Sequence, residues 1–192
     1  MKKTALLILL LALCLLVAPF AVAEGGPVVR SDALAAYTDG QGHLYLPGRA
    51  EAINARTADS VVGMDAYRVL YLSPDGFTDT QDLCVVDLQS LQESLVATDV
   101  KAACLANEDI AYYVTGANRT KLNRVDLRSL TSQVVYTAAE PIDRLYMSAE
   151  GLIFQLVDQA ATMLYDEQTD RFEIYNGDMP RSGATGEVMQ VR

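Results

Sequence analysis

The sequence contains no tryptophan, one histidine (His43) and three cysteines among its 192 residues. A catalytic triad needs a nucleophile, a base and a group that orients the base, and His43 is the only histidine available as such a base. The stretch Asp39–His43 instead predicts a hairpin turn ahead of a strand. Glycine-rich phosphate loops and the Gly-x-Ser-x-Gly elbow are also missing. We therefore predict no catalytic residue, no metal ligand and no cofactor, and no ligand-binding residue stands out.

Basic residues are scarce as well. Apart from the first 23 residues, the chain has 13 basic and 25 acidic residues, a net charge of −12. Nucleic acid binding needs a basic footprint, and an anionic lipid surface repels a chain of this charge. The composition excludes nucleic acid and the membrane surface as partners. Apolar residues make up 51% of the chain, which excludes disorder driven by charge.

The first 23 residues have the pattern of a secretory signal peptide of bacterial type. A cationic start is followed by the apolar run Ala5–Val17, by Pro19, and by a small-x-small site that ends at Ala23. We expect cleavage between Ala23 and Glu24, so that the mature protein is secreted or lies in the cell envelope. An uncleaved anchor is the alternative, because the uncharged run is nearly long enough to span a bilayer. A lipoprotein would use Cys14, but Leu13 precedes it where a small residue is expected.

The remaining chain contains internal repeats. Val-Asp-Leu-Gln-Ser-Leu at Val86–Leu91 returns as Val-Asp-Leu-Arg-Ser-Leu at Val125–Leu130, and a weaker copy follows at Tyr165–Thr169. The strands before these corners also match, at a period of about 41 residues: Arg68–Leu72, Asp109–Tyr113 and Glu150–Phe154.

Each repeat predicts four short strands bounded by turn residues. In the second repeat these strands are Ile110–Thr115, Lys121–Leu127, Ser132–Thr137 and Asp143–Ser148. Short helices are plausible only at Ser31–Tyr37 and Ala50–Ala58, and both are ambiguous. This order places Cys84 on a second strand and Cys104 on a fourth strand, about 10 Å apart. A disulfide needs the two Cα atoms within about 7 Å, so we predict free thiols.

The repeated aspartates have a structural explanation. Asp87, Asp126 and Asp166 each end a strand, where the carboxylate can accept N–H groups of the following turn. Cation binding is the alternative, but each aspartate stands at a separate corner. A weak calcium site among Asp75, Asp79 and Asp82 is a second possibility, without EF-hand spacing.

The first strands Val69–Leu72 and Leu152–Phe154 are apolar on both faces, so both faces of these strands must be covered. Four-stranded units of about 40 residues that cover one another are blades of a β-propeller. Residues 36–176 resemble the secreted bacterial propeller repeats of the broad Tol-B and YWTD type, although the YWTD tetrapeptide is absent. The resemblance implies an all-β, antiparallel repeat domain of about three and a half blades. The N-terminal strands either form an irregular fourth blade or leave the ring open.

The predicted organisation is a signal peptide (1–23), a linker (24–35), the repeat domain (36–176) and a tail (177–192). The leading hypothesis is a non-catalytic extracytoplasmic module that binds a protein, peptide or glycan. The alternatives are a secreted hydrolase or lyase with an Asp, Glu and Tyr site, and a truncated fragment of a longer propeller. The terminal blades around Leu44–Met64 and Leu164–Ile174 are expected to dock on a second copy or a partner domain.

Overall fold

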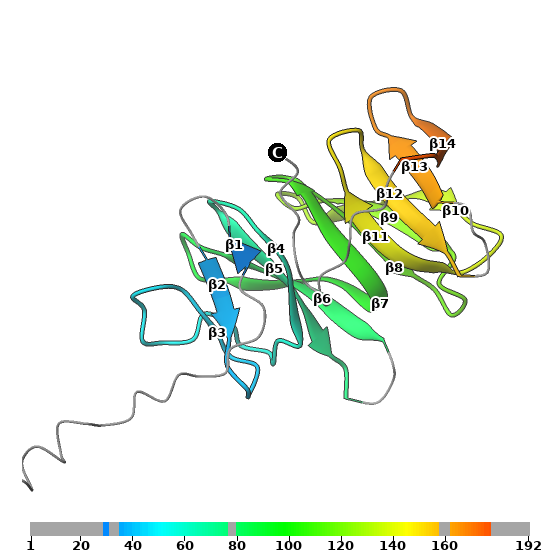
Figure 1. Cartoon of the computed structure of the whole chain (residues 1–192). Helices are drawn as coiled ribbons and strands as arrows, with labels where there is room; N and C mark the ends of the chain where they lie inside the picture. The colour runs from blue at the N-terminus through cyan, green and yellow to red at the C-terminus, as the bar shows by residue number, and fades with distance from the viewer. Residues whose placement is uncertain (1–28, 31–34, 77–79, 158–161, 178–192) are drawn as a thin grey trace, which may run out of the picture.

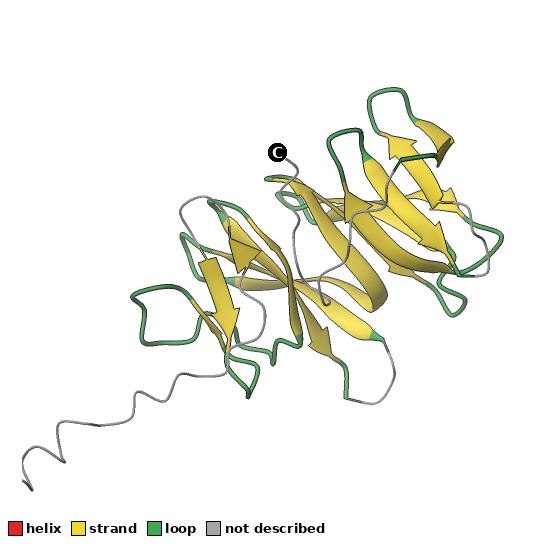
Figure 2. Cartoon of the chain, viewed as in Figure 1, coloured by secondary structure: helices red, strands yellow, loops and turns green. Residues whose placement is uncertain are grey.

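The structure, a computed structural model, describes residues 29–30, 35–76, 80–157 and 162–177. The signal peptide, its cleavage site at Ala23 and Glu24, Asp79 and residues 178–192 lie outside this part of the chain. Every regular element in the described residues is a β-strand, and none of these residues is in a helix (Figure 2). The all-β, antiparallel prediction is therefore confirmed.

The strands form three sheets that follow one another in sequence order (Figure 1). The first sheet has the order β1-β2-β3, the second β10-β9-β8-β7-β6-β5-β4 and the third β11-β12-β13-β14, with every neighbouring pair antiparallel. The bounds are β1 (Val29–Arg30), β2 (Ala35–Thr38), β3 (Leu44–Tyr45), β4 (Ser60–Met64), β5 (Arg68–Pro74), β6 (Gln81–Asp87), β7 (Glu93–Asn107), β8 (Ile110–Thr115), β9 (Lys121–Asp126), β10 (Thr131–Thr137), β11 (Ile142–Met147), β12 (Leu152–Leu156), β13 (Thr162–Asp166) and β14 (Arg171–Tyr175).

The second sheet consists of two blades that share one long strand. The first half of β7 pairs with β6 and the second half pairs with β8, and both pairings reach Val100. Asp99, next to the change of partner, has a positive φ of 57°. Blade 1 is therefore β4, β5, β6 and the first half of β7. Blade 2 is the second half of β7 with β8, β9 and β10, and blade 3 is β11–β14.

The predicted division into repeats is wrong at its last strand. The strand expected at Asp143–Ser148 was placed with the hairpins that begin at Ile110, but β11 pairs with β12 and opens blade 3. The segment between β10 and β11 carries the chain from one blade to the next instead of turning back as a hairpin. Cys104 lies on the second half of β7, which pairs with β8, and therefore belongs to blade 2. Cys84 and Cys104 are both buried and free, so the prediction of unpaired thiols is confirmed. The reason differs from the predicted one, because the two cysteines lie in different blades and not two strands apart in one blade.

The register also corrects the sequence alignment of the first strands. Val69 of β5, Ala111 of β8 and Leu152 of β12 lie opposite the equivalent residues Val86, Val125 and Tyr165. The sequence alignment had matched Leu70, not Val69, to Ala111. A shift of one residue matters because it moves a side chain to the other face of its blade.

Three apolar clusters hold the sheets together. The first lies between the three-stranded sheet and blade 1, the second between blades 1 and 2, and the third between blades 2 and 3. Within β5, Tyr71 enters the first cluster while Leu70 and Leu72 enter the second. This alternation confirms that a strand apolar on both faces is covered on both faces.

The blades approach one another closely where β4 meets β7. A Cβ added at Gly63 would lie 2.6 Å from the Cβ of Leu105, so the packing requires glycine there. The N-terminal residues pack on blade 1 without forming a four-stranded blade. The sequence predicts Val61–Asp65 among the strands of a possible irregular fourth blade, but Val61–Met64 belong to β4 of blade 1. Ala50–Ala58, where a short helix was considered, is an irregular loop. β1 begins inside the segment expected to be a linker.

The irregular loop is fastened to blade 1 by Glu93. One carboxylate oxygen, Oε2, accepts hydrogen bonds from the backbone N–H of Ala55 (2.6 Å) and Arg56 (3.2 Å) and from the Tyr71 hydroxyl (2.6 Å). Leu44, Ile53, Ala58, Val61 and Met64 are buried in the first cluster. These residues are therefore not available as the N-terminal docking surface that the sequence suggested.

Candidate functional site

The first repeated corner connects β6 and β7. Asp87 Oδ1 accepts hydrogen bonds from Gln89 N (3.1 Å), Ser90 N (2.8 Å) and Ser90 Oγ (2.8 Å). The backbone and side chain of Ser90 lower the pKa of the Asp87 carboxyl group below its usual value. The carboxylate thus acts as the acceptor that closes the turn.

The other two corners have the same construction. Asp126 Oδ1 accepts from Arg128 N (2.9 Å), Ser129 N (2.8 Å) and Ser129 Oγ (3.1 Å). At the third corner Asp166 accepts from Gln168 N (2.9 Å) and Thr169 Oγ1 (2.7 Å). The structure thus places all three aspartates inside their own turns, at separate corners.

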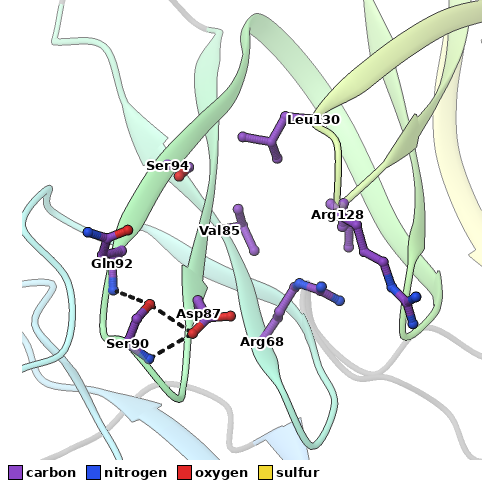
Figure 3. A pocket seen from close by; sticks show the side chains of 9 residues that line it. Arg68, Val85, Asp87, Ser90, Gln92, Ser94, Arg128 and Leu130 are labelled. Carbon is purple, nitrogen blue, oxygen red and sulfur yellow. Dashed lines mark hydrogen bonds between the residues drawn. The ribbon is translucent and has the colours of Figure 1, made fainter.

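A groove of about 270 Å³ lies between the first two corners, at the junction of blades 1 and 2 (Figure 3). Val85 and Leu127 are nearly fully buried in it, with exposed fractions of 5% and 4%, whereas Leu130 is 37% exposed. The polar side chains on one side of the groove come from blade 1, and Leu127, Arg128 and Leu130 of blade 2 line the other side. The lining residues are Arg68, Val85, Asp87, Ser90, Gln92, Ser94, Leu127, Arg128 and Leu130.

The charged groups of the groove lie close together. Arg68 and Asp87 are direct partners across β5 and β6, and Figure 3 shows Ser90 on one side of Asp87 and the Arg68 and Arg128 side chains on the other. Asp109 Oδ1 accepts from Arg128 Nε at 2.5 Å and lies 3.4 Å from Arg68 Nη1, which also donates to the Glu108 carbonyl. This network holds Arg68 in place, while the Arg128 side chain remains 69% exposed.

At the equivalent position between blades 2 and 3, an ion pair takes the place of the groove. The β-sheet register matches Val85 to Arg124, and the repeat matches Leu127 to Glu167. There Arg124 Nε donates to Glu167 Oε1 at 2.7 Å. The Tyr112 hydroxyl is buried beside this pair, and burial together with the nearby Glu167 carboxylate raises its pKa. Two substitutions between repeats thus replace an ion pair by two apolar side chains.

Leu130 adopts a backbone conformation that is unusual for its residue type. Its φ is 54°, and the equivalent residues Leu91 and Asp170 have φ values of 57° and 51°. Aspartate tolerates this left-handed conformation, whereas a bulky side chain is strained in it. Leu91 compensates by packing against the first cluster, but Leu130 projects into the groove. A strained, partly exposed leucine at this position is a reason to suspect a binding role.

The single histidine lies far from this groove in the fold, in the hairpin between β2 and β3. Asp39 accepts from Gln41 N (2.9 Å) and His43 N (2.8 Å), and its other oxygen lies 2.8 Å from His43 Nδ1. These hydrogen bonds, those from His43 first, lower the pKa of Asp39 to about 2. The arrangement is that of a closed hairpin turn.

The calcium alternative has little support in the described residues. Asp82 lies 3.4 Å from Arg56 Nη1, and Asp79 lies outside this part of the chain. Among the residues that the structure describes, no three His, Cys, Asp or Glu side chains converge to hold a metal ion. No helix that could cross a membrane occurs in the same residues.

Of the residues that line the groove, the sequence predicted a site role for Asp87 alone. Arg68, Val85, Leu127, Arg128 and Leu130 come from two repeats and meet only because the blades stack. The usable signal was the difference between repeats, Val85 against Arg124 and Leu127 against Glu167.

No protein-family model and no curated protein matches this sequence. Solved structures do match. A chain of a nidogen–laminin complex matches 75% of this chain at 7% identity, with a TM-score of 0.52. The apo form of AztD from Citrobacter koseri matches 78% at 13% identity and 0.54. A chain of a mitotic checkpoint complex matches 79% at 11% identity and 0.54.

These neighbours are β-propellers, and the fold of this chain is a partial β-propeller of the kind that the sequence resembles. The chain spans 59%, 45% and 50% of the lengths of the three neighbours. The described residues accordingly form an open arc of three blades and a smaller sheet.

Proposed function

We propose that this protein is a non-catalytic, extracytoplasmic binding module that holds a protein partner in the groove between blades 1 and 2. One observation carries the proposal: Val85 and Leu127 replace the ion pair that fills the neighbouring interface. The replacement leaves a groove above these two nearly buried side chains, with Leu130 exposed beside them. Anchor side chains of protein partners characteristically enter pockets of this kind.

The carboxylates at the groove are engaged in structural interactions, which favours a binding role over a catalytic one. The Asp87 carboxylate accepts three hydrogen bonds within its own turn, and Asp109 is paired with arginine. Two of the structural neighbours come from protein complexes, one with nidogen and laminin and one of the mitotic checkpoint. The extracytoplasmic location rests on the leader sequence, and a secreted hydrolase or lyase remains the alternative proposal.

The test fills the groove with the kind of ion pair that occupies the equivalent position between blades 2 and 3. Val85→Arg combined with Leu127→Glu copies the Arg124–Glu167 pair into the junction of blades 1 and 2. The matched control, Arg124→Val combined with Glu167→Leu, makes the reverse exchange one blade away. Tagged mature protein is used to capture partners from the envelope and culture fluid of the producing cells, and bound proteins are quantified by mass spectrometry.

We expect a partner to be captured by the wild type and by the control variant, and to be lost from the groove variant. Thermal melts of the three proteins show that each one is folded. Equal capture by the wild type and the groove variant would overturn the proposal. Turnover of a glycan or ester substrate by the folded wild-type protein would support the enzyme alternative.

A further inference from the structure

The longest uncharged stretch of the chain after its first 23 residues lies on an exposed strand. This stretch, Ser129–Ala139, contains eleven consecutive residues without a charge. It includes all of β10, in which Thr131–Val134 are exposed, and the Val134 side chain is 52% exposed. In a protein with a net charge of −10, a neutral and exposed strand is a surface on which another chain meets no charge repulsion.

β10 is paired on one side only. It is the last strand of the seven-stranded sheet, and its partner is β9 (Figure 1). Edge strands of native proteins commonly carry charges that discourage pairing with another chain. The outer strand of blade 3, β14, follows this rule with Arg171 and Glu173, whereas the equivalent residues of β10 are Thr131 and Gln133.

The pairing with β9 shows which backbone groups of β10 are directed outward. The β9–β10 hairpin begins with the pair Asp126 and Thr131, and in the equivalent pair of blade 1 the aspartate N donates to the carbonyl oxygen across the hairpin at 2.9 Å. Because hydrogen-bonded and non-hydrogen-bonded pairs alternate in an antiparallel ladder, Ser132 and Val134 direct their N–H and C=O groups away from β9. A bulge follows Val134 and ends the regular edge, so the stretch open to pairing is short.

We propose that two copies of this chain associate by antiparallel pairing of their β10 strands, with Gln133 of each copy at the twofold axis. In this register the outward N–H and C=O groups of Ser132 bond those of Val134 in the second copy, and these hydrogen bonds lie before the bulge. The contact lies at the outer rim of blade 2, not on the terminal blades that the sequence analysis expects to dock. It does not depend on the function proposed for the groove.

A second copy is the occupant that the composition of β10 favours. A twofold axis brings the central residue of a strand opposite its own mate, so the strand must be free of charge there. β10 meets this condition over its whole length. The same pairing centred on β14 would place one Glu173 carboxylate opposite another.

A charge exchange at the axis tests this register. Gln133→Glu and Gln133→Lys each place like charges opposite one another in a dimer of identical copies, so we expect each to weaken self-association about tenfold or more. An equal mixture of the two variants pairs opposite charges and should associate as tightly as the wild type. Sedimentation of the mature proteins over a range of micromolar concentrations, with a thiol reductant present, measures this association, and thermal melts show that each variant is folded.

Ile174→Glu is the matched control, because Ile174 is equivalent to Val134 on the outer strand of blade 3 and is 63% exposed. We expect it to leave the association unchanged, whereas Val134→Glu weakens it. Amide hydrogen exchange of the wild type gives a second readout. Exchange at Ser132 and Val134 should slow as the protein concentration rises, while exchange at Gln133, whose N–H faces β9, should stay constant.

Three results would overturn the inference. The first is a wild-type protein that remains a monomer at every concentration. The second is a mixture of the Gln133 variants that associates no better than each variant alone. The third is association that Ile174→Glu abolishes and Val134→Glu leaves intact, because the contact would then lie on blade 3.

Discussion

The two junctions between blades have the same framework and different surfaces. Both contain an apolar cluster built from alternate residues of antiparallel strands. At the junction of blades 2 and 3, Arg124 and Glu167 cover this cluster with an ion pair. At the junction of blades 1 and 2, Val85 and Leu127 leave a groove. A repeat architecture can therefore keep one core and change the chemistry above it with two substitutions.

The largest effect is expected in the shared core. Leu83 and Leu122 occupy equivalent positions in the two junctions, and each is fully buried. We expect Leu83→Ala and Leu122→Ala each to lower the free energy of unfolding by about 2–5 kcal/mol, through lost burial and a cavity. Urea denaturation measures both. A cost for Leu83→Ala far below that for Leu122→Ala would show that the groove loosens the core beneath it.

The corner aspartates should have a smaller effect that depends on pH. Turn hydrogen bonds lower the pKa values of Asp87 and Asp126 from 3.8. Because the folded-state pKa is lower, the stabilisation is fully present above pH 3.8 and is lost as the pH falls through the lowered value. Asp126→Ala should lower the melting temperature at pH 7 and flatten its decline in acid. Calorimetry between pH 7 and pH 2 checks this, and an unchanged acid limb would contradict it.

The two leucines with positive φ distinguish packing from binding. Asparagine relieves the backbone strain at either position, but Leu91 also packs against the first cluster. We expect Leu91→Asn to destabilise the protein by about 1 kcal/mol and Leu130→Asn to leave the stability nearly unchanged. Leu130→Asn should nevertheless weaken capture of the partner. Equal losses of stability at both positions would argue against a binding role for Leu130.

The smallest effect is expected for the ion pair. The Arg124 and Glu167 side chains are 25% and 39% exposed, and such pairs contribute about 0–1 kcal/mol. Replacing the pair by Val and Leu should therefore change the free energy of unfolding by less than about 1 kcal/mol. Chemical denaturation at low and high salt tests this. A large loss would mean that the pair, not the apolar cluster, holds blades 2 and 3 together.

The features that the sequence predicted are those produced by neighbours along the chain. The Val-Asp-Leu-x-Ser-Leu corners close through hydrogen bonds between residues two and three apart, as at Asp87 and Ser90. The hairpins on either side follow from these turns and from strand patterning. For this reason the strands, the repeat and the propeller class could all be predicted from the sequence.

The features that the sequence did not predict depend on how separate repeats meet. The strands that open blades 2 and 3 were assigned to the wrong blades. The second half of β7 and β11 each follow the hairpins of one blade in sequence, but they pair with β8 and β12, the first hairpin strands of the following blade. The alignment of the first strands was wrong by one residue, which only cross-strand register reveals.

The groove is another feature that the sequence did not predict. The sequence by itself determined the local turns, the strands and the acidic charge of this protein, because each depends on short-range interactions or on composition. The tertiary structure decided which faces of the blades meet, and hence that Val85 lies near Leu127 while Arg124 meets Glu167. These pairs are about 40 residues apart in sequence, and only the stacking of one blade on the next brings them together.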